Sequence, residues 1–360
     1  MKITNFEVFP ITIPLKTPFI ISSGTQNDYF GVLLKLTTED GIDGWGEAAP
    51  SARVTGETPE SVQKVLNNKI KPLLLARDAE ELENIMEAVE ETIPNQPSTC
   101  CAVDIALHDL LGKNAQVPIK NLLGGYRDSI PISFTVVIGT VEESIQSAQK
   151  YIDMGAKVLK VKLGVDPNED LARLKALREA FGYEIMITAD ANQGYSVNQA
   201  INTLNKIARY DIEFVEQPVV ADNLEGLKKV HNAVDVPIMA DECACSVDDV
   251  KRLIKLELVD MVNIKLMKCG GLRNAAQISN LTEAAGIPCQ IGCMIETGVS
   301  ITAGTHLALA LKNIKYADLD GHIFLKHDVV TNHQITKNGM NTITGSPGLG
   351  IEIDFSNYMK

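Results

Sequence analysis

The sequence predicts an α/β protein in which a parallel (β/α) barrel follows an N-terminal α+β region. From about residue 130 onward, short apolar segments alternate with amphipathic ones at a nearly constant spacing, which is typical of parallel βα units. Before that point, strand-like segments come first and helix-like segments follow, which is typical of an α+β unit. We therefore expect one domain over residues 1–125 and a barrel domain over residues 126–325.

Strands begin the α+β region. Residues 2–13 and 29–37 are rich in Ile, Val, Phe and Leu, and Glu39-Asp40-Gly41 predicts a hairpin turn. Helices are expected over residues 58–75, 79–92 and 98–113. Thr58 and Pro59 form a favourable start for the first helix, and Ser98 is a candidate cap for the third.

Eight apolar segments predict the strands of the barrel. They cover residues 131–138, 157–163, 184–190, 212–216, 237–241, 260–265, 288–292 and 314–320. Eight strands with one repeat length favour a closed barrel over an open sheet. The tail, residues 326–360, is too short for a further unit, and we expect it to pack on the first domain, with Ile351-Glu352-Ile353 pairing back onto it.

The composition excludes several classes of function. The chain has 360 residues, of which 45% are apolar and 22% charged, and its net charge is −13. Phosphate backbones and anionic lipids repel such a surface, so we expect neither a nucleic acid nor a membrane partner. No apolar run approaches the roughly 20 residues of a membrane span, and the N-terminus lacks the pattern of a signal peptide. The seven cysteines show no disulfide-framework spacing, which favours reduced thiols in a cytoplasmic protein.

Charged residues stand where the predicted barrel strands end. They are Lys160 and Lys162, Asp190, Glu216, Asp241, Lys265, and Asp318 with Asp320. The steps from residue 162 to 190, 216, 241 and 265 are 28, 26, 25 and 24 residues, so each step is one βα unit. Successive strands therefore carry these side chains to one level, the C-terminal mouth, where barrel enzymes keep their active sites.

Three of these residues predict a metal site. Asp190, Glu216 and Asp241 end neighbouring strands with no cation between them, and three carboxylates held together repel one another. A hard divalent cation relieves this repulsion, and carboxylates with open positions suit Mg²⁺. Zinc is disfavoured because no His or Cys joins the set. We expect one Mg²⁺ per subunit.

The lysines flank the predicted metal site. Lys162 and Lys265 are expected on opposite faces of a substrate, so that one removes an α-proton and the other returns a proton from the far side. A nearby divalent cation and a second ammonium group should lower the lysine pKa, as a base requires. Lys160 shares an interior face with Lys162, and with Mg²⁺ it would hold the enediolate charge that develops on a carboxylate.

A structural interpretation competes with this one. A single Asp or Lys at a strand end is usually just solvated, and a Lys-x-Lys pair is more often a surface feature than a catalytic one. Here five successive strands each end in the charge that the chemistry requires, which argues against coincidence and favours the functional interpretation.

In these residues the chain resembles the enolase superfamily, and within it the muconate lactonizing enzyme subgroup. The matching motifs are Lys160-x-Lys162, Asp190-x-Asn192, Glu216-Gln217-Pro218, Asp241-Glu242, and Asn263-x-Lys265 with Cys269-Gly270-Gly271. The resemblance covers nearly the whole chain and implies a modified TIM barrel, (β/α)7β, with an N-terminal α+β capping domain. It also implies that Asn192 and Glu242 support the metal ligands. Enolase-superfamily sites are a known example of a Lys or His base that works with Mg²⁺.

Within the subgroup the chain looks like the dipeptide epimerases. The mark is Asp318-Leu319-Asp320, because in those enzymes the Asp-x-Asp pair binds the α-ammonium group of a dipeptide. Two carboxylates that face the mouth favour a cationic amine, whereas the competing interpretation is a solvated strand end. The resemblance implies an Mg²⁺-dependent isomerase that inverts the α-carbon of the C-terminal residue of an L,L-dipeptide.

Specificity is expected to come from the cap loops near residues 16–26 and 50–56. The candidate substrate contacts are Phe19, Ile20, Gly24, Arg53, Thr135, Met294 and Glu296. In some Ala-Glu epimerases an arginine of the first loop addresses the glutamate carboxylate, and this chain has none there. Arg53 either substitutes for it or is a surface residue. Phe19 and Ile20 suggest an apolar side chain in the pocket or simply close the cap onto the barrel, and Glu296 either welcomes a cationic group or is an acid at a helix N-terminus.

Other reactions could use the same lysines and metal. The alternatives are a cycloisomerase, an o-succinylbenzoate synthase and an N-acylamino acid racemase, whose substrates have no free amine for Asp318 and Asp320. A non-catalytic binding protein would have lost a base or a ligand, and all the core positions are present. Relatives of this kind often form dimers or larger rings, so we expect a homo-oligomer.

Overall fold

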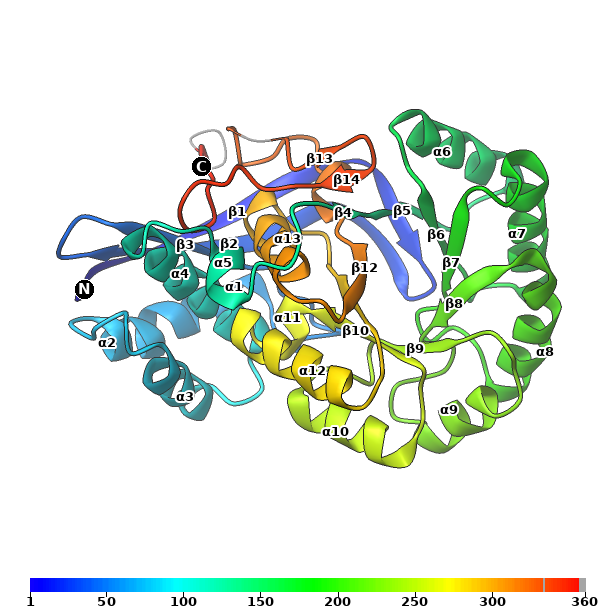
Figure 1. Ribbon diagram of the computed structural model, residues 1–360, viewed down its shortest axis with the longest axis horizontal. Coiled ribbons are helices and arrows are strands. Elements are labelled where there is room, and N and C mark those ends of the chain that lie inside the picture. Colours follow the sequence, from blue (N-terminus) through cyan, green and yellow to red (C-terminus); the bar gives the residue numbers. More distant parts are fainter. Residues whose placement is uncertain (333, 356–360) are drawn as a thin grey trace.

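The computed structural model describes residues 1–332 and 334–355, which form a barrel with a cap at one side (Figure 1). Eight parallel strands form one sheet in the order β12-β11-β10-β9-β8-β7-β6-β5. They are β5 (Ser133–Val136), β6 (Val158–Lys162), β7 (Met186–Asp190), β8 (Ile212–Glu216), β9 (Ile238–Ala240), β10 (Met261–Lys265), β11 (Cys289–Gly292) and β12 (Ile314–Asp318). The predicted α/β fold class is confirmed, and each predicted strand differs from the observed one by at most two residues at either end.

Seven helices connect these strands and cover the outside of the barrel (Figure 1). They are α6 (Val141–Asp153), α7 (Pro167–Phe181), α8 (Val197–Ile207), α9 (Leu224–His231), α10 (Val247–Leu256), α12 (Leu272–Ala284) and α13 (Gly298–Ala310). After β12 the described residues continue into a short 3-10 turn, η3 (Gly321–Phe324), rather than an eighth covering helix. The fold is therefore (β/α)7β, which corrects the plain eightfold pattern as the resemblance implied.

Local sequence signals set the ends of several barrel helices. Thr140, Ser196 and Ser246 each accept a bond from the backbone N–H three residues on, and the side chain of that residue bonds back. Such capping boxes satisfy N–H groups that the first helical turn leaves without partners. The two end strands of the sheet are linked by side chains, because the Ser133 hydroxyl of β5 donates to the Asp318 carboxylate of β12 at 2.9 Å.

The cap, residues 1–125, combines an antiparallel sheet with helices. The strands lie in the order β1 (Ile3–Ile21), β2 (Gly24–Thr38) and β3 (Asp43–Ala48). The helical segments are α1 (Pro59–Val65), η1 (Leu66–Ile70), α2 (Lys71–Leu74), α3 (Leu82–Thr92), α4 (Pro97–Asn114) and α5 (Ile119–Leu123). The helix expected over residues 58–75 is interrupted by the π-helical turn η1, just ahead of Pro72, which has no N–H to donate. Ser98 lies inside α4 instead of capping it, and its N–H donates to the Glu57 carboxylate at 2.7 Å.

The hairpin of β1 and β2 is longer than the sequence indicated. We expected a loop over residues 16–26, but the pairing continues to Ile21 opposite Gly24 and is broken by an irregularity between Pro14 and Phe19. Prolines at positions 10, 14 and 18 hid this continuation, and they are tolerated because β1 is an edge strand. The hairpin reaches over the barrel toward β6 and β7, where the Ser22 hydroxyl donates to the carbonyl oxygen of Asn192 at 2.9 Å (Figure 1).

The tail lies against the cap, although one predicted pairing is wrong. Ile353 bridges to Val330, within the tail itself, instead of to a cap strand. The Phe355 ring centre lies 4.6 Å from that of Phe9 and 5.5 Å from that of Trp45, so the tail still contacts the cap. Two short strands, β13 (Thr336–Lys337) and β14 (Met340–Asn341), pair with β4 (Ile130–Pro131). The division into domains at about residue 125 stays a prediction. None of the helices in the described ranges is long and apolar enough to cross a bilayer.

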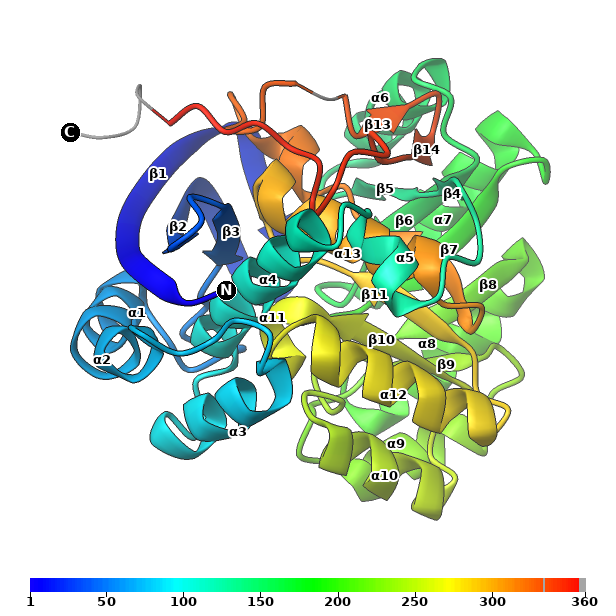
Figure 2. The ribbon, with the colours of Figure 1, turned by 60° about the vertical axis from the view of Figure 1, so that its left-hand side comes forward.

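Buried polar side chains join the cap to the barrel, where α4 lies between the cap sheet and the barrel helices (Figure 2). Glu47 of β3 accepts from the N–H groups of Thr297 and Ser300 at 2.8 and 2.9 Å, at the start of α13. Asp104 of α4 accepts from the N–H of Leu272, the first residue of α12. His306 of α13 contacts the carbonyl oxygen of Leu349 through Nε2 at 3.1 Å. We call Glu47, Asp104 and His306 the cap seam.

Candidate active site

A cavity of about 490 Å³ opens at the C-terminal ends of the barrel strands, beneath the cap hairpin. Its lining includes most of the predicted site residues: Phe19, Gly24, Arg53, Thr135, Lys160, Lys162, Asn192, Asp241, Glu242, Lys265, Met294, Asp318 and Asp320. Asp190 and Glu216 are fully buried beside it, in contact with Lys160. The regular spacing of strand ends therefore predicted which side chains meet.

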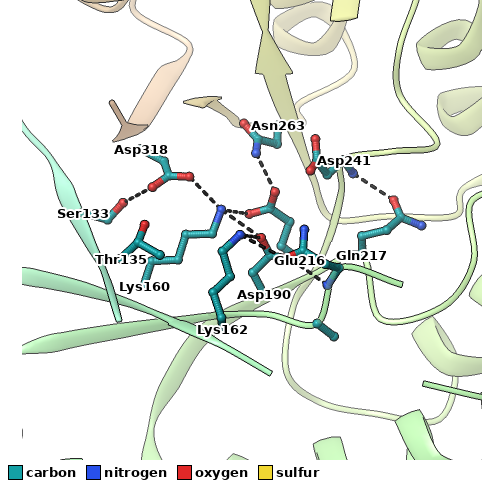
Figure 3. A network of polar contacts seen from close by, with 12 residues as sticks. Ser133, Thr135, Lys160, Lys162, Asp190, Glu216, Gln217, Asp241, Asn263 and Asp318 are labelled. Carbon is teal, nitrogen blue, oxygen red and sulfur yellow. Dashed lines mark hydrogen bonds and ion pairs between the residues drawn. The ribbon is translucent and has the colours of Figure 1, made fainter. Parts of the chain in front are cut away.

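Lys160 lies at the centre of the charged network (Figure 3). Its Nζ is 2.7 Å from Glu216 Oε2, 3.1 Å from Asp190 Oδ2 and 2.7 Å from Asp318 Oδ2. Burial alone would lower the pKa of Lys160, but the three carboxylates outweigh burial and raise it well above its usual value. Lys160 is thus held as an ammonium ion, suited to stabilise negative charge rather than to accept a proton.

Lys162 and Lys265 reach the cavity from opposite sides of the barrel. Lys162 ends β6 and Lys265 ends β10, four places apart in an eight-stranded sheet. Lys162 Nζ donates to Asp190 Oδ2 at 2.6 Å and to Asn192 Oδ1 at 3.0 Å. Lys265 Nζ donates to Asp241 Oδ2 at 2.9 Å. Each amine is therefore fixed by one of the predicted metal-binding carboxylates.

The expected lowering of the lysine pKa is not produced by the protein's own charges. Burial lowers the pKa of Lys265, but the neighbouring Asp241 and Glu216 outweigh it and raise the pKa above its usual value. The prediction treated the lysines as neighbours of other cations, whereas the structure places each of them against carboxylates.

The three predicted metal-binding carboxylates do not surround one open position. The Lys160 ammonium lies between Asp190 and Glu216, and Lys265 contacts Asp241. Among the described residues, no group of three or more His, Cys, Asp or Glu side chains is arranged as a ready metal site. The expectation that no cation intervenes between these acids is therefore wrong, because the lysine ammonium groups pair with them.

The chemistry of this donor set nevertheless fits a hard cation. Asp190 and Glu216 are paired in register on adjacent strands, and burial together with repulsion from Asp190 raises the pKa of Glu216 to about 8. Oε2 of Glu242, beside the same group, is buried without a hydrogen-bond partner. Negative charge is in excess here, and oxygen-only donors suit Mg²⁺.

Lys268 is a buried member of this network that the sequence analysis missed. It lies in the four-residue helix α11 (Leu266–Cys269), directly after β10. Its Nζ contacts the Asp241 carboxylate and donates to the carbonyl oxygens of Asp241 at 2.6 Å and Asn263 at 3.1 Å. The helical pattern gave no sign that a lysine one turn beyond the strand would turn inward.

Asp318 and Asp320 lie together on the far side of the cavity from β7. Asp318 accepts from Ser133 and Lys160, and Asp320 accepts from the N–H of Thr135 at 2.7 Å. Burial and repulsion from Asp318 raise the pKa of Asp320 to about 7. Each carboxylate is 4% exposed and lines the cavity, so the pair is accessible to a small cationic group.

Two of the predicted substrate contacts lie elsewhere. The carbonyl of Ile20 accepts from the N–H of Ile138 at 3.1 Å, and its neighbour Ile21 lines the cavity instead. Glu296 turns back into the protein, where its carboxylate accepts from the N–H of Met294 at 2.7 Å. Burial and repulsion from Glu47 raise the pKa of Glu296 to about 8, so it offers no exposed anion to the cavity.

The remaining candidates frame the mouth of the cavity. Phe19 packs edge-on against Phe324 with ring centres 4.9 Å apart, so it closes the cap onto the barrel and also lines the cavity. A side chain at position 24 would bring Cβ within 3.0 Å of the Arg53 guanidinium, so Gly24 and Arg53 are in close contact.

Family models match both parts of the chain. The model described as Mandelate racemase / muconate lactonizing enzyme, N-terminal domain, matches residues 3–124, and Enolase C-terminal domain-like matches residues 143–357. The chain belongs to the mandelate racemase / muconate lactonizing enzyme family of the enolase superfamily. The resemblance found in the motifs is therefore confirmed.

Several members of this family are similar over the whole length. L-Ala-D/L-Glu epimerase of Clostridium acetobutylicum is 39% identical over 98% of this chain and 99% of its own length. N-succinyl-L-Arg/Lys racemase of Bacillus cereus is 35% identical over 98% of this chain and 96% of its own. The crystal structure of a dipeptide epimerase from Enterococcus faecalis, complexed with Mg and the dipeptide L-Leu-L-Tyr, superposes with a TM-score of 0.95 at 38% identity, covering 98% of this chain and 100% of that one.

Proposed function

We propose that this protein is a Mg²⁺-dependent dipeptide epimerase that inverts the α-carbon of the C-terminal residue by a 1,1-proton transfer. The observation that carries the proposal is the placement of Lys162 and Lys265 at the ends of strands on opposite sides of one cavity. Its relatives are epimerases and racemases, and the chain is an isomerase that acts on amino acid derivatives.

The two lysines exchange a proton with one carbon. One of them, as a neutral amine, takes the α-proton while the C–H electron pair passes into the neighbouring carboxylate as an enediolate. The other, as an ammonium ion, donates a proton to the opposite face, and the electron pair returns to form the new C–H bond. Because the two amines stand on different sides, the returned proton inverts the configuration.

Charged neighbours stabilise the intermediate. Lys160 is held protonated by Asp190, Glu216 and Asp318, so it can bind the negative charge that develops on the carboxylate. Asp190, Glu216 and Asp241 would hold the Mg²⁺, with Asn192 and Glu242 supporting them, and the ion would make the α-proton more acidic by neutralising carboxylate charge.

The acid pair on β12 supports a dipeptide over an N-acylated amino acid. Asp318 and Asp320 line the cavity opposite β7, and two carboxylates attract the free α-ammonium group of a dipeptide. N-acylamino acid racemisation is the second candidate, which the 35% identity to an N-succinyl amino acid racemase supports. An acylated substrate has no cation for this pair.

Isotope exchange separates these reactions. The protein is incubated with Mg²⁺ in heavy water, with a dipeptide library and with N-succinyl amino acids that carry the same C-terminal residues. We expect loss of the α-proton NMR signal at the C-terminal residue of dipeptides, appearance of the L,D-diastereomer, and no reaction after chelation of the metal. If label enters no dipeptide, the proposal fails, and if it enters only the N-succinyl compounds, the second candidate replaces it.

Two further expectations belong to this proposal. All seven cysteines are free thiols in the structure, which supports a reducing, cytoplasmic location. Assembly into a homo-oligomer stays a prediction, which sedimentation of the purified protein would test.

A further inference from the structure

Arg53 is the arginine that the fold leaves without a partner. The chain has eight arginines, and the other seven each donate a hydrogen bond to a side chain or a carbonyl oxygen. Arg53 forms no hydrogen bond or ion pair with any residue in ranges 1–332 and 334–355. It lines the active-site cavity nonetheless, so its guanidinium is free to bind an anion there.

The position of Arg53 is across the cavity from the acid pair. Its guanidinium lies against Gly24, and the nearby Ser22 hydroxyl is bonded to the carbonyl oxygens of Ala191 and Asn192, which follow β7. Asp318 ends β12, which is three places from β7 around the barrel, by way of β5 and β6. A dipeptide whose ammonium group lies at Asp318 therefore extends its C-terminal residue toward Arg53.

The charges of the cavity leave one requirement unmet. The ammonium groups of Lys160, Lys162 and Lys265 each contact a carboxylate of the protein. The neutral polar residues that line the cavity with Arg53 are Ser23, Thr25, Gln26 and Ser51. Glu296, the acid that was expected to receive a cationic side chain, faces the backbone of Met294 instead. A cationic side chain would meet only the guanidinium, whereas a carboxylate would complete it.

We propose that Arg53 selects dipeptides whose C-terminal residue has an acidic side chain, and that its guanidinium binds the side-chain carboxylate. This inference rests on the proposed epimerase function and specifies its substrate class. The ammonium group of the substrate is matched by the acid pair and its main-chain carboxylate by Lys160, so the anion at Arg53 is a second carboxylate.

An isosteric pair of substrates tests this inference. L-Ala-L-Glu and L-Ala-L-Gln differ in charge but hardly in shape, so the ratio of their kcat/KM values reports on a side-chain carboxylate. We expect the wild-type protein to favour L-Ala-L-Glu by at least about tenfold, since each tenfold factor is about 1.4 kcal/mol of binding. Arg53→Gln should reduce this ratio at least tenfold, Arg53→Lys should keep most of it, and Arg209→Gln, at an arginine that donates to the carbonyl oxygen of Lys206, should leave it unchanged.

Each other outcome overturns the inference. A wild-type ratio near one, or a preference for L-Ala-L-Leu or L-Ala-L-Lys, shows that the cavity does not select a carboxylate. Equal loss of both substrates in Arg53→Gln shows that Arg53 binds a group common to them or supports the fold. Label uptake into L-Ala-L-Gln in any of these cases leaves the epimerase proposal standing, whereas absence of label from every dipeptide refutes that proposal itself.

Discussion

The barrel rim and the cap seam both bury charged side chains, but they satisfy them differently. In the seam, backbone groups do most of the work: Glu47 and Asp104 accept from N–H groups at the starts of α13 and α12, and His306 bonds to the carbonyl oxygen of Leu349. At the rim, side chains of opposite charge face one another, as with Lys160 among Asp190, Glu216 and Asp318. Backbone partners are fixed by the fold, whereas side-chain partners can exchange for a substrate or an ion.

This difference separates groups that hold the structure from groups that act in it. A carboxylate that accepts from helix N–H groups is stabilised in one geometry and leaves little to bind. A buried carboxylate whose partner is a lysine costs much of what the pair gains, so a buried ion pair is weak evidence for stability. Lesions at the rim should therefore remove activity and spare the fold, and lesions at the seam should do the reverse.

The largest expected effect is the loss of a proton-transfer lysine. Lys162→Ala and Lys265→Ala should each lower the epimerisation rate by at least about 10³-fold, because general acid–base groups contribute about 10² to 10⁴ each. The midpoint of urea unfolding should move little. Lys157→Ala, at an exposed lysine just before β6, is the matched control and should retain full activity. Chiral chromatography of the product measures the rate.

Isotope exchange in these variants tests the two-base arrangement itself. With one lysine left, exchange of a single diastereomer can persist while inversion stops. If both variants still invert the substrate, the assignment of Lys162 and Lys265 to opposite faces is wrong.

Lys268 is the rim residue that also resembles the seam. Its Nζ donates to two backbone carbonyl oxygens as well as to the Asp241 carboxylate. Lys268→Met should therefore lower the free energy of unfolding by about 3 to 5 kcal/mol, because it removes one partner of a buried charge pair. It should also slow epimerisation, since Asp241 loses one of its two lysine contacts. Urea denaturation and the rate assay measure both effects.

The matched control is Lys255→Met, at an exposed position on α10. An unchanged unfolding midpoint in Lys268→Met would contradict the reading of Lys268 as a structural link. Loss of stability with full activity would place it in the seam rather than at the rim.

The same division explains what the sequence could predict. The strand ends were found because their spacing reports the βα repeat, which carries Asp190, Glu216 and Lys265 to one level. Lys268, Ile21 and the direction of Glu296 were not found, because they depend on turns after strands and on how the cap docks. The hairpin continuation through Pro14 and Pro18 was hidden for a similar reason, since only the sheet order shows that β1 is an edge.

In the seam, Glu47→Gln should affect stability and not chemistry. The Glu47 carboxylate accepts from Tyr29, Thr297 and Ser300, and an amide has one acceptor oxygen and two donors of its own. Donors left without an acceptor should cost about 3 kcal/mol of unfolding free energy in total. Glu87→Gln, on the exposed face of α3, is the control. A fall in the rate per folded molecule larger than the fall in stability would contradict the assignment of Glu47 to the seam.

The smallest expected effect is the acid sensitivity that His306 gives to the seam. Nδ1 accepts from the N–H of Lys120 and Nε2 contacts the Leu349 carbonyl, so the ring is held neutral, and burial lowers its pKa from 6.5 to about 4. The unfolded chain binds a proton below about pH 6.5 and the folded chain only below about pH 4, so this contribution to stability is complete above pH 6.5 and is lost as the pH falls toward 4.

Between pH 7 and pH 5 the loss should be about 2 kcal/mol, at about 1.4 kcal/mol per pKa unit. His306→Gln keeps a donor and an acceptor but does not titrate, so its unfolding free energy should fall by about 2 kcal/mol less than that of the wild type over this range. Comparing the two proteins cancels the buried acids of the rim, which titrate in both. Equal pH dependence in the two would show that His306 is already charged in the folded protein and that the seam, like the rim, holds a charge on a side chain.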